Sequence, residues 1–529
     1  MSVVNDLLAI YGQLQSDRSP HEPVLDQVRD LFMPFRGDMT TRGYGGRKIG
    51  AIFDSTGAVA ADALVNFMVG NLFPPTGDWV KLRGPDGKTE DLDVDAETML
   101  LNLEQSNFYS EAAKCLKDLI ILGNSVMYIE EKSRRLQADG STFEGVSFEA
   151  VNLSDCYWKI GRYGTPLVFC REYYMTEAEV SKYFEVPLEN EPFSERKILH
   201  FVLPADTSPV KSPGNQQYVS VWIGEDHGTP LRISGYDYQP YIVSRLDVFP
   251  GEQYGRGRGH LARPDAAGAN ELKRQALIAA SRDINPPLMV EDESILDTDI
   301  SSSGILVVRP ATQMQPTYLT TSTNYGVANE MARQDHDQIK AAFLADILLD
   351  PSTQPRSAEE SRQRSERLIQ RLAGPARMIE TGFLGPITES LIKIMVDSGI
   401  LPAVEQSGVL NVSFVSPFYI QQRELVSMKT WRFISRRLEI YNAIQDPALL
   451  DDIDWDAVAK IDADNSDVPS GIFFTDEEVE EKREVRAEMA AQQQMMDMMS
   501  QAQQMQGGQG GQGGMDQAPV PQGGPVEEV

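Results

Sequence analysis

Cysteine and histidine are scarce in this chain of 529 residues. There are three cysteines and five histidines, with no CxxC and no HxxxH spacing. The odd, sparse set of Cys115, Cys156 and Cys170 is typical of a reducing compartment and offers no disulfide framework. Because zinc sites are built from clustered Cys and His ligands, we expect no metal site.

Long hydrophobic runs are missing as well. No window approaches 18 uninterrupted apolar residues, so we expect no transmembrane helix and no membrane partner. The N-terminal stretch MSVVNDLLAIYGQLQSDR lacks a basic region and a long apolar run, which predicts no secretory signal. A hydrophobic content of 41% is enough for packed cores. The length predicts about two to four domains.

Positive charge is in deficit, since 48 Lys and Arg oppose 78 Asp and Glu, for a net charge of −30. Affinity for DNA comes mainly from cations on phosphates, so this balance excludes a protein that grips nucleic acid over its whole surface. The charge is uneven: residues 451–529 hold 18 acidic and 4 basic side chains, whereas residues 356–377 hold six Arg and three Glu. The simplest reading of both segments is solvated helix faces.

The stretch from Tyr254 to Leu349 organises the chain. Helix-forming residues from Arg263 to Ile284 end at Asn285-Pro286-Pro287, where proline stops a helix. A second helix is predicted from Val327 to Leu349, and each helix would be about 30–35 Å long. Between them, short apolar runs at 288–290 and 304–308 predict strands. Two matched helices with a small β tip favour a stalk over a catalytic pocket.

The pattern of helices and strands in the first half of the chain predicts an α+β domain. A helix is expected at Ser55 to Asn71, with Asp54 as its N-cap. The other predicted helices are 3–15, two within 96–122 that separate near Asn107, and 176–184. Strands are predicted at 79–82, 126–129, 157–160, 167–169, 198–202, 218–222 and 241–243.

After Pro355 a long helix is predicted from Ser357, with Glu360 completing a capping box, to Ser398. A kink is expected at Gly374-Pro375. A strand at 409–415 is predicted to return to the first domain, and helices follow at 421–443, 456–461 and 475–504. Residues 506–529 are rich in Gly and Gln and should be disordered.

Motifs that carry chemistry are incomplete. Gly87-Lys88-Thr89 lacks the earlier glycine of a phosphate-binding loop, and no Ser/His/Asp set can be assembled. Gly255, Gly257 and Gly259 alternate with arginines ahead of a helix, which fits either a phosphate-cradling loop or a hinge at a domain junction. We therefore expect no enzyme, no catalytic residues and no cofactor.

Four motifs together resemble the portal, or head-to-tail connector, proteins of short-tailed, podovirus-type bacteriophages. They are Phe53-Asp54-Ser55-Thr56 running into Leu72-Phe73-Pro74-Pro75 and Trp79, Gly123-Asn124-Ser125 with Tyr128, Tyr254-Gly255-Arg256-Gly257, and the helix from Asn270 that ends in Asn-Pro-Pro-Leu. The resemblance implies a multidomain portal fold with an α/β wing, a two-helix stem, a small β-containing clip and an α-helical C-terminal crown. It maps residues 1–260 to the wing, 261–285 to the first stem helix, 286–324 to the clip, 325–350 to the second stem helix, 351–420 to a channel loop and long wing helix with the returning strand, 421–505 to the crown, and 506–529 to the tail.

The resemblance also implies a function. Portal proteins form a ring of identical subunits, usually twelve, at a capsid vertex of the virion, and double-stranded DNA passes through the ring during packaging and ejection. The implied partners are the terminase large subunit, the major capsid and scaffolding proteins and a tail adaptor protein, with assembly in the bacterial host cytoplasm. The channel candidates are Ser352, Thr353, Gln354 and Arg356, and the candidates for the stem and oligomer interface are Lys273, Arg274, Ile339 and Phe343.

Two other classes stay open. One is an enzyme, such as a nuclease or the packaging ATPase, against which the incomplete phosphate-binding loop counts. The other is a non-conducting structural protein of the virion, such as a tail or scaffolding component. An image of a ring with a central hole separates a conduit from a scaffold.

Overall fold

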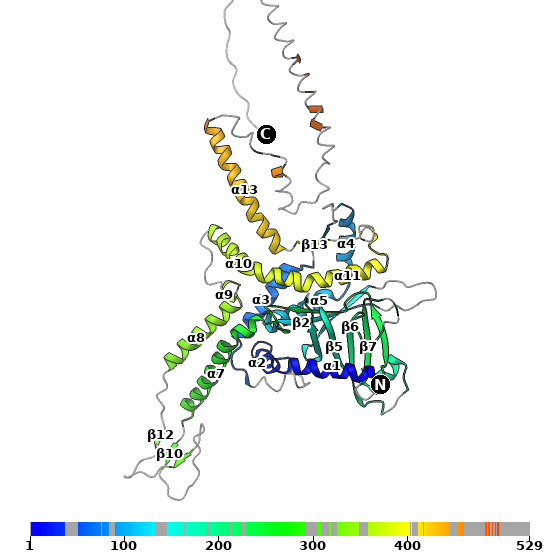
Figure 1. The fold of residues 1–529 in the computed structure, drawn as a ribbon. Coiled ribbons are helices and arrows are strands. Elements are labelled where there is room, and N and C mark those ends of the chain that lie inside the picture. Colours follow the sequence, from blue (N-terminus) through cyan, green and yellow to red (C-terminus); the bar gives the residue numbers. More distant parts are fainter. Residues whose placement is uncertain are drawn as a thin grey trace, which may run out of the picture. The chain divides into compact units, whose positions relative to one another are not determined.

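The structure of the chain is a computed structural model (Figure 1). It describes residues 2–36, 51–75, 77–83, 90–132, 145–162, 164–187, 191–211, 214, 216–224, 229–286, 288–290, 305–307, 317–318, 325–348, 358–402, 404, 411–415, 417–444, 453, 455, 457–459, 482–483, 485–486, 489, 492 and 495–496. By contacts the chain divides into residues 1–450 and 451–529. Each unit is described by itself, and the first one holds nearly all the described residues.

The first half contains a helical N-terminal part followed by a region rich in antiparallel strands, as predicted for an α+β fold. The helices are α1 (Ser2–Arg18), α2 (Glu22–Phe32), α3 (Thr56–Leu72), α4 (Glu90–Gln105), α5 (Phe108–Leu122) and α6 (Glu177–Phe184). The N-cap of α3 is Ser55, one residue beyond the predicted Asp54. Asp54 instead accepts a hydrogen bond from the Thr56 hydroxyl at 3.1 Å.

Two antiparallel sheets form the β part of this half. The larger has the order β4-β5-β6-β7-β8 and the smaller the order β3-β2-β9. Their strands are β2 (Asn124–Glu131), β3 (Val146–Val151), β4 (Cys156–Ile160), β5 (Pro166–Thr176), β6 (Glu195–Pro204), β7 (Tyr218–Gly224), β8 (Arg232–Tyr236) and β9 (Tyr241–Arg245). The predicted strands are confirmed, whereas β3 and β8 were not predicted. Both are edge strands of their sheets, and β8 contains a glycine.

The predicted returning strand is confirmed. Strand β1 (Val80–Arg83) pairs antiparallel with β13 (Asn411–Phe414), in the register that places Val80 opposite Phe414. Trp79, directly before β1, is buried, and its ring lies nearly parallel to those of Phe108 and Phe414 at centroid distances of 6.0 and 6.4 Å. An aromatic stack thus joins the two strands to α5.

A second, smaller core lies under α1. The residues Val4, Leu7, Tyr11 and Leu14 recur at helical spacing and pack against the inner side chains of the larger sheet. Side chains return to the same face about every 3.6 residues along a helix and every two residues along a strand, so one face of α1 can pack on one face of the sheet. The amphipathic helix predicted at 3–15 is therefore confirmed and slightly longer than expected.

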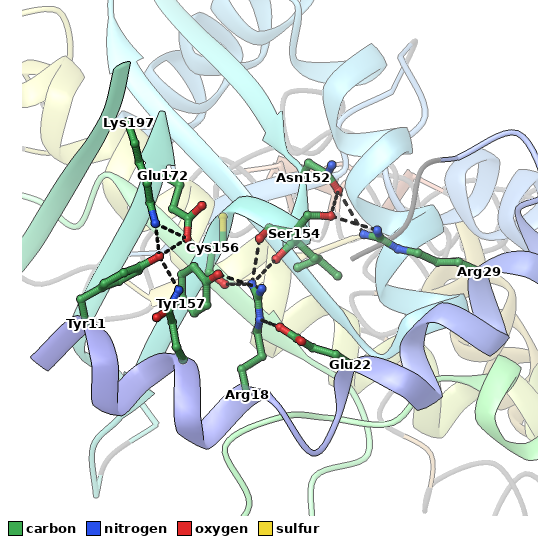
Figure 2. Close-up of polar contacts among 12 residues, drawn as sticks. Tyr11, Arg18, Glu22, Arg29, Asn152, Ser154, Cys156, Tyr157, Glu172 and Lys197 are labelled. Carbon is green, nitrogen blue, oxygen red and sulfur yellow. Dashed lines mark hydrogen bonds and ion pairs between the residues drawn. The ribbon is translucent and has the colours of Figure 1, made fainter. Parts of the chain in front are cut away.

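Polar contacts fix α1 and α2 to the same sheet (Figure 2). The buried guanidinium of Arg18 donates to the carbonyl oxygens of Leu153 (3.2 Å), Ser154 (2.9 Å) and Cys156 (3.0 Å). It also donates to the Tyr157 hydroxyl at 2.9 Å and to Glu22 at 2.7 Å. A buried charge is tolerated only with such full pairing. The network sets the position of the helices on the sheet.

The C-terminal part of the first unit is helical. It contains α10 (Ala358–Ile379), a five-residue π-helix (Glu380–Leu384), α11 (Gly385–Asp397) and α13 (Pro417–Ile444). Helix α10 continues through Gly374-Pro375, where the kink was predicted. The regular hydrogen-bond pattern is interrupted further on, at the π-helix before Pro386, which has no N–H to donate. Several predictions lie outside the described residues. They are the capping box that starts at Ser357, the tail at 506–529 and most of the helices predicted after 455. The described positions from 455 to 496 are helical.

Candidate functional site

The helix pair α7 and α8 is the candidate functional site. Helix α7 (Arg258–Ile284) leads into a small sheet of β10 (Leu288–Val290), β11 (Ile305–Val307) and β12 (Thr317–Tyr318), and α8 (Tyr325–Ala342) returns from it (Figure 1). Strand β10 is central, parallel to β11 and antiparallel to β12. The two helices pack along each other. The predicted order of helix, β excursion and helix is confirmed, and β12 adds a strand that was not predicted.

The first half of α7 is embedded in the main core. Its buried residues are Gly259, Ala262, Ala266 and Ala269, which lie at helical spacing. Their small side chains let α7 come close to α2, α3 and α5. This packing also explains why α7 begins five residues before the predicted Arg263. Pro264 is accommodated inside the helix because core contacts outweigh its lost hydrogen bond.

Backbone atoms of the protein itself occupy the space beside the glycines that precede α7. A Cβ on Gly255 would lie 2.3 Å from the Leu246 carbonyl oxygen, and one on Gly257 would lie 2.4 Å from the Ile121 carbonyl oxygen. The side chain of Asn124 accepts from the Gly255 N–H at 2.8 Å and donates to the Gly255 carbonyl at 3.0 Å. Because these groups are occupied, the glycines form a packed junction. The phosphate-cradling alternative is wrong.

The two helices approach closely at one point. An added Cβ on Gly268 of α7 would lie 3.0 Å from Oδ2 of Asp335 on α8. Burial, and then the charge of Asp265, raise the pKa of Asp335. One residue further along α8, Nε2 of His336 lies 3.2 Å from Oδ1 of Asp54, the residue before α3. Asp335 thus lies against α7 at the crossing, and His336 links α8 to the residue before α3.

Ile339 and Phe343, the apolar candidates for the stem and oligomer interface, lie inside the single chain. Both side chains are fully buried within the single chain, and the Phe343 ring packs on Phe32 of α2 at a centroid distance of 5.2 Å. They have no surface left for a second subunit. The same packing ends α8 early: Leu344 adopts a positive φ of 56°, and the chain continues as the short α9 (Ala345–Leu348).

The other two predicted stem residues lie on the outer half of α7. Lys273 is exposed, and Arg274 makes an ion pair with Glu271 at 2.6 Å one turn earlier. An ion pair this exposed contributes little to stability. Both residues remain accessible to a neighbouring molecule.

Apolar side chains are exposed on both helices of the pair. Their spacing is visible in the sequence, but the sequence does not show which apolar positions face outward. On α7 they are Leu261 (62% exposed), Leu277 (50%), Ile278 (36%) and Ile284 (76%), and on α8 they are Val327 (56%) and Met331 (51%). Val327 and Met331 are one helical turn apart and therefore share a face. These exposed apolar side chains make the helix pair a candidate interaction surface.

The predicted channel residues Ser352, Thr353, Gln354 and Arg356 lie outside the described residues.

A Ser–His contact that the sequence did not show lies in the larger sheet. His200 bonds the Ser220 hydroxyl through Nε2 and the Tyr241 hydroxyl through Nδ1, both at 2.8 Å. All three residues are fully buried, and burial lowers the pKa of His200 well below its usual value. A substrate cannot reach this pair, so it is part of the core. Neighbours on different strands cannot be paired from sequence alone.

Over residues 4–473 the chain matches the sequence model of a family described as bacteriophage head to tail connecting protein. The chain belongs to this connector family. Membership makes it a component of a phage virion. No curated protein matches the chain. Among solved structures, the chain is similar to a chain of "Virion of native gene transfer agent (GTA) particle", with a TM-score of 0.30 and 10% identity, covering 64% of this chain and 74% of that chain.

In the part of the chain that the structure describes, no group of three or more His, Cys, Asp or Glu side chains is arranged to hold a metal ion. None of the helices in this part is both long enough and apolar enough to span a membrane.

Proposed function

We propose that this connector protein is a portal subunit. It forms a closed ring at a capsid vertex, conducts double-stranded DNA during packaging and ejection, and is the attachment point for the packaging motor and the tail. The observation that carries the proposal, beside family membership, is the α7–α8 pair. It is rooted in the core at one end and exposes apolar side chains on both helices at the other.

The exposed apolar side chains favour contact between copies of the chain. Ring interfaces are heterologous, so one surface of each subunit meets a different surface of the next. A helix pair with apolar groups on both members can supply both surfaces. In this reading α7 and α8 are the stem, the sheet of β10, β11 and β12 is the clip, the α+β half is the wing, and α13 begins the crown.

The acidic chain suits a conduit. DNA must slide through a ring, and a surface poor in cations forms few lasting phosphate contacts. The loop at 350–356 is proposed to touch the passing DNA through Ser352, Thr353, Gln354 and Arg356. The proposed partners are a ring of about twelve copies, the terminase large subunit, the major capsid and scaffolding proteins and a tail adaptor. No enzymatic activity is part of the proposal.

The test uses the purified full-length protein, mass photometry and negative-stain images. We expect a large closed oligomer with a central hole. The double variant Val327→Asp/Met331→Asp places charges on the exposed face of α8 and should reduce ring formation at least tenfold without unfolding the chain. The matched control is Val485→Asp/Met489→Asp, an exposed Val and Met at the same spacing in the second unit.

Wild-type protein that stays monomeric at all salt concentrations would overturn the proposal. An oligomer without a central hole would favour the non-conducting structural protein. If both double variants assemble equally well, α8 does not contribute to the ring contact.

A further inference from the structure

Helix α13 carries positive charge in a strongly acidic chain. Between Pro417 and Ile444 the sequence has five Lys or Arg and two Glu, whereas the whole chain has a net charge of −30. A local reversal of charge on a long helix needs a physical reason, because such residues usually alternate in sign on a solvated face.

One side of α13 is covered by the protein itself. Ser427 and Ile434, seven residues apart and therefore on one face, are 7% and 1% exposed. The helix packs against α3 and α10. This face fixes the orientation of the helix on its own chain.

The opposite side is basic. At 100° per residue, Lys429, Arg432 and Arg436 fall within about 60° of one another, on the side facing away from Ile434. All three are exposed. None of them makes an ion pair or a hydrogen bond with a described residue, although Glu439 lies one turn after Arg436. We call these three side chains the basic face.

Apolar side chains flank the basic face on both sides. Met428 (44% exposed) and Trp431 (46%) lie on one flank. Phe433 (56%), Ile440 (46%) and Ile444 (64%) lie on the other, where the Arg437 guanidinium sits 5.6 Å from the centre of the Phe433 ring. In a ring, a helix has one neighbour on each side, and the two contacts differ. Neighbouring copies would cover the flanks and leave the basic face open.

We propose that the basic face of α13 contacts the phosphate backbone of double-stranded DNA. This inference rests on the proposed ring and names a DNA contact separate from the loop at 350–356. The span from Lys429 to Arg436 is about 10 Å, and a duplex carries one charge per about 1.7 Å of its axis, so three cations can meet several phosphates. A protein partner would also cover the apolar flanks, whereas the three cations alone match the charge of a phosphate backbone.

The test compares three forms of the full-length ring. The variant Lys429→Gln/Arg432→Gln/Arg436→Gln neutralises the basic face. The control Arg162→Gln/Lys182→Gln/Lys211→Gln removes the same charge at exposed positions in the first half. Binding to a random-sequence 30-base-pair duplex is measured by fluorescence anisotropy over a series of salt concentrations. Ring formation is checked for each form by negative-stain images.

We expect the slope of log K against log salt to become shallower by at least about 1 in the basic-face variant, the effect of one lost phosphate contact. The control should keep the wild-type slope, and all three forms should make rings. Rings that do not bind the duplex, or equal slopes in the three forms, would refute the inference and leave the ring proposal standing. Failure of the wild-type chain to form rings would count against the proposed function instead.

An acidic protein segment is the competing occupant. A synthetic peptide of residues 474–490, which is rich in Glu, is therefore titrated against the same rings. If the basic-face variant loses binding to this peptide while duplex binding is unchanged, the face belongs to a protein contact and the DNA assignment is wrong.

Discussion

The ring of Phe343, at the end of α8, packs on the ring of Phe32 in α2 with their centroids 5.2 Å apart. Helix α8 is thus anchored in the main core by its last turn, while its first turns expose Val327 and Met331. The two ends of one helix serve different purposes. Substitutions at the two ends should therefore have different consequences.

Phe343→Ala should destabilise the monomer. Removing a fully buried phenylalanine leaves a cavity and costs about 3–5 kcal/mol. We expect a lower Tm by circular dichroism and, because the fold is weakened, secondary loss of assembly. Val327→Ala is the contrasting change and should leave Tm within about 1 °C, since the side chain is half-exposed. Equal effects of the two substitutions on Tm would contradict the anchoring role of Phe343.

Gly257→Ala should prevent normal packing at the junction before α7. The new Cβ would lie 2.4 Å from the Ile121 carbonyl oxygen and 2.5 Å from the Gly123 nitrogen, and neither backbone can retreat easily. We expect poor soluble yield or a large loss of Tm.

The control for this change is Gly12→Ala, at an exposed position in α1 with nothing within 4 Å of the new Cβ. Alanine replaces glycine there in a helix interior, so the free energy of unfolding should rise by about 0.5–1 kcal/mol. A tolerated Gly257→Ala would show that the junction is looser than its contacts indicate.

Arg18→Met should disconnect α1 from the larger sheet. Loss of the guanidinium leaves the carbonyls of Leu153, Ser154 and Cys156 without their donor, and breaking a buried charged contact costs about 3–5 kcal/mol. Faster proteolysis of the first 20 residues is the direct measurement. Exposed Lys182→Met on α6 is the control and should leave the cleavage rate unchanged.

Acid should destabilise the junction through His260. Burial, and then the charges of Arg263 and Arg256, lower the pKa of His260 to about 4 in the folded chain, against about 6.5 in the unfolded one. Between these values the unfolded chain binds a proton that the folded chain does not. The contribution of His260 is thus complete above pH 6.5 and decreases as the pH falls toward 4.

His260→Gln removes this titration and keeps a side chain that can accept from the Gly257 N–H, which His260 contacts at 3.3 Å. The variant should show a flatter dependence of the free energy of unfolding on pH between 6.5 and 4, measured by denaturant titration. An unchanged slope would mean that other groups account for the acid sensitivity.

Sequence patterns predicted where helices and strands lie, but they did not predict how these elements pack against one another. Runs such as Val4, Leu7, Tyr11 and Leu14 show their period directly, and the return of β13 could be expected from a lone apolar run. The break of α8 at Leu344 could not, because it depends on where Phe343 finds space in the core. The same limit applies to the candidate site. Periodicity identified Ile339 and Phe343 as apolar, but only the structure shows which apolar positions face the chain's own interior.

The pairing of β1 with β13 joins residues more than 300 positions apart. During synthesis the ribosome makes Val80–Arg83 long before Asn411–Phe414, so β1 waits as an open edge for most of translation. This strand pair cannot form until Phe414 has left the exit tunnel, and a chain that ends before Asn411 keeps an unpaired strand beside Trp79. Closure of this strand pair thus distinguishes chains that extend past Phe414 from chains that end before Asn411.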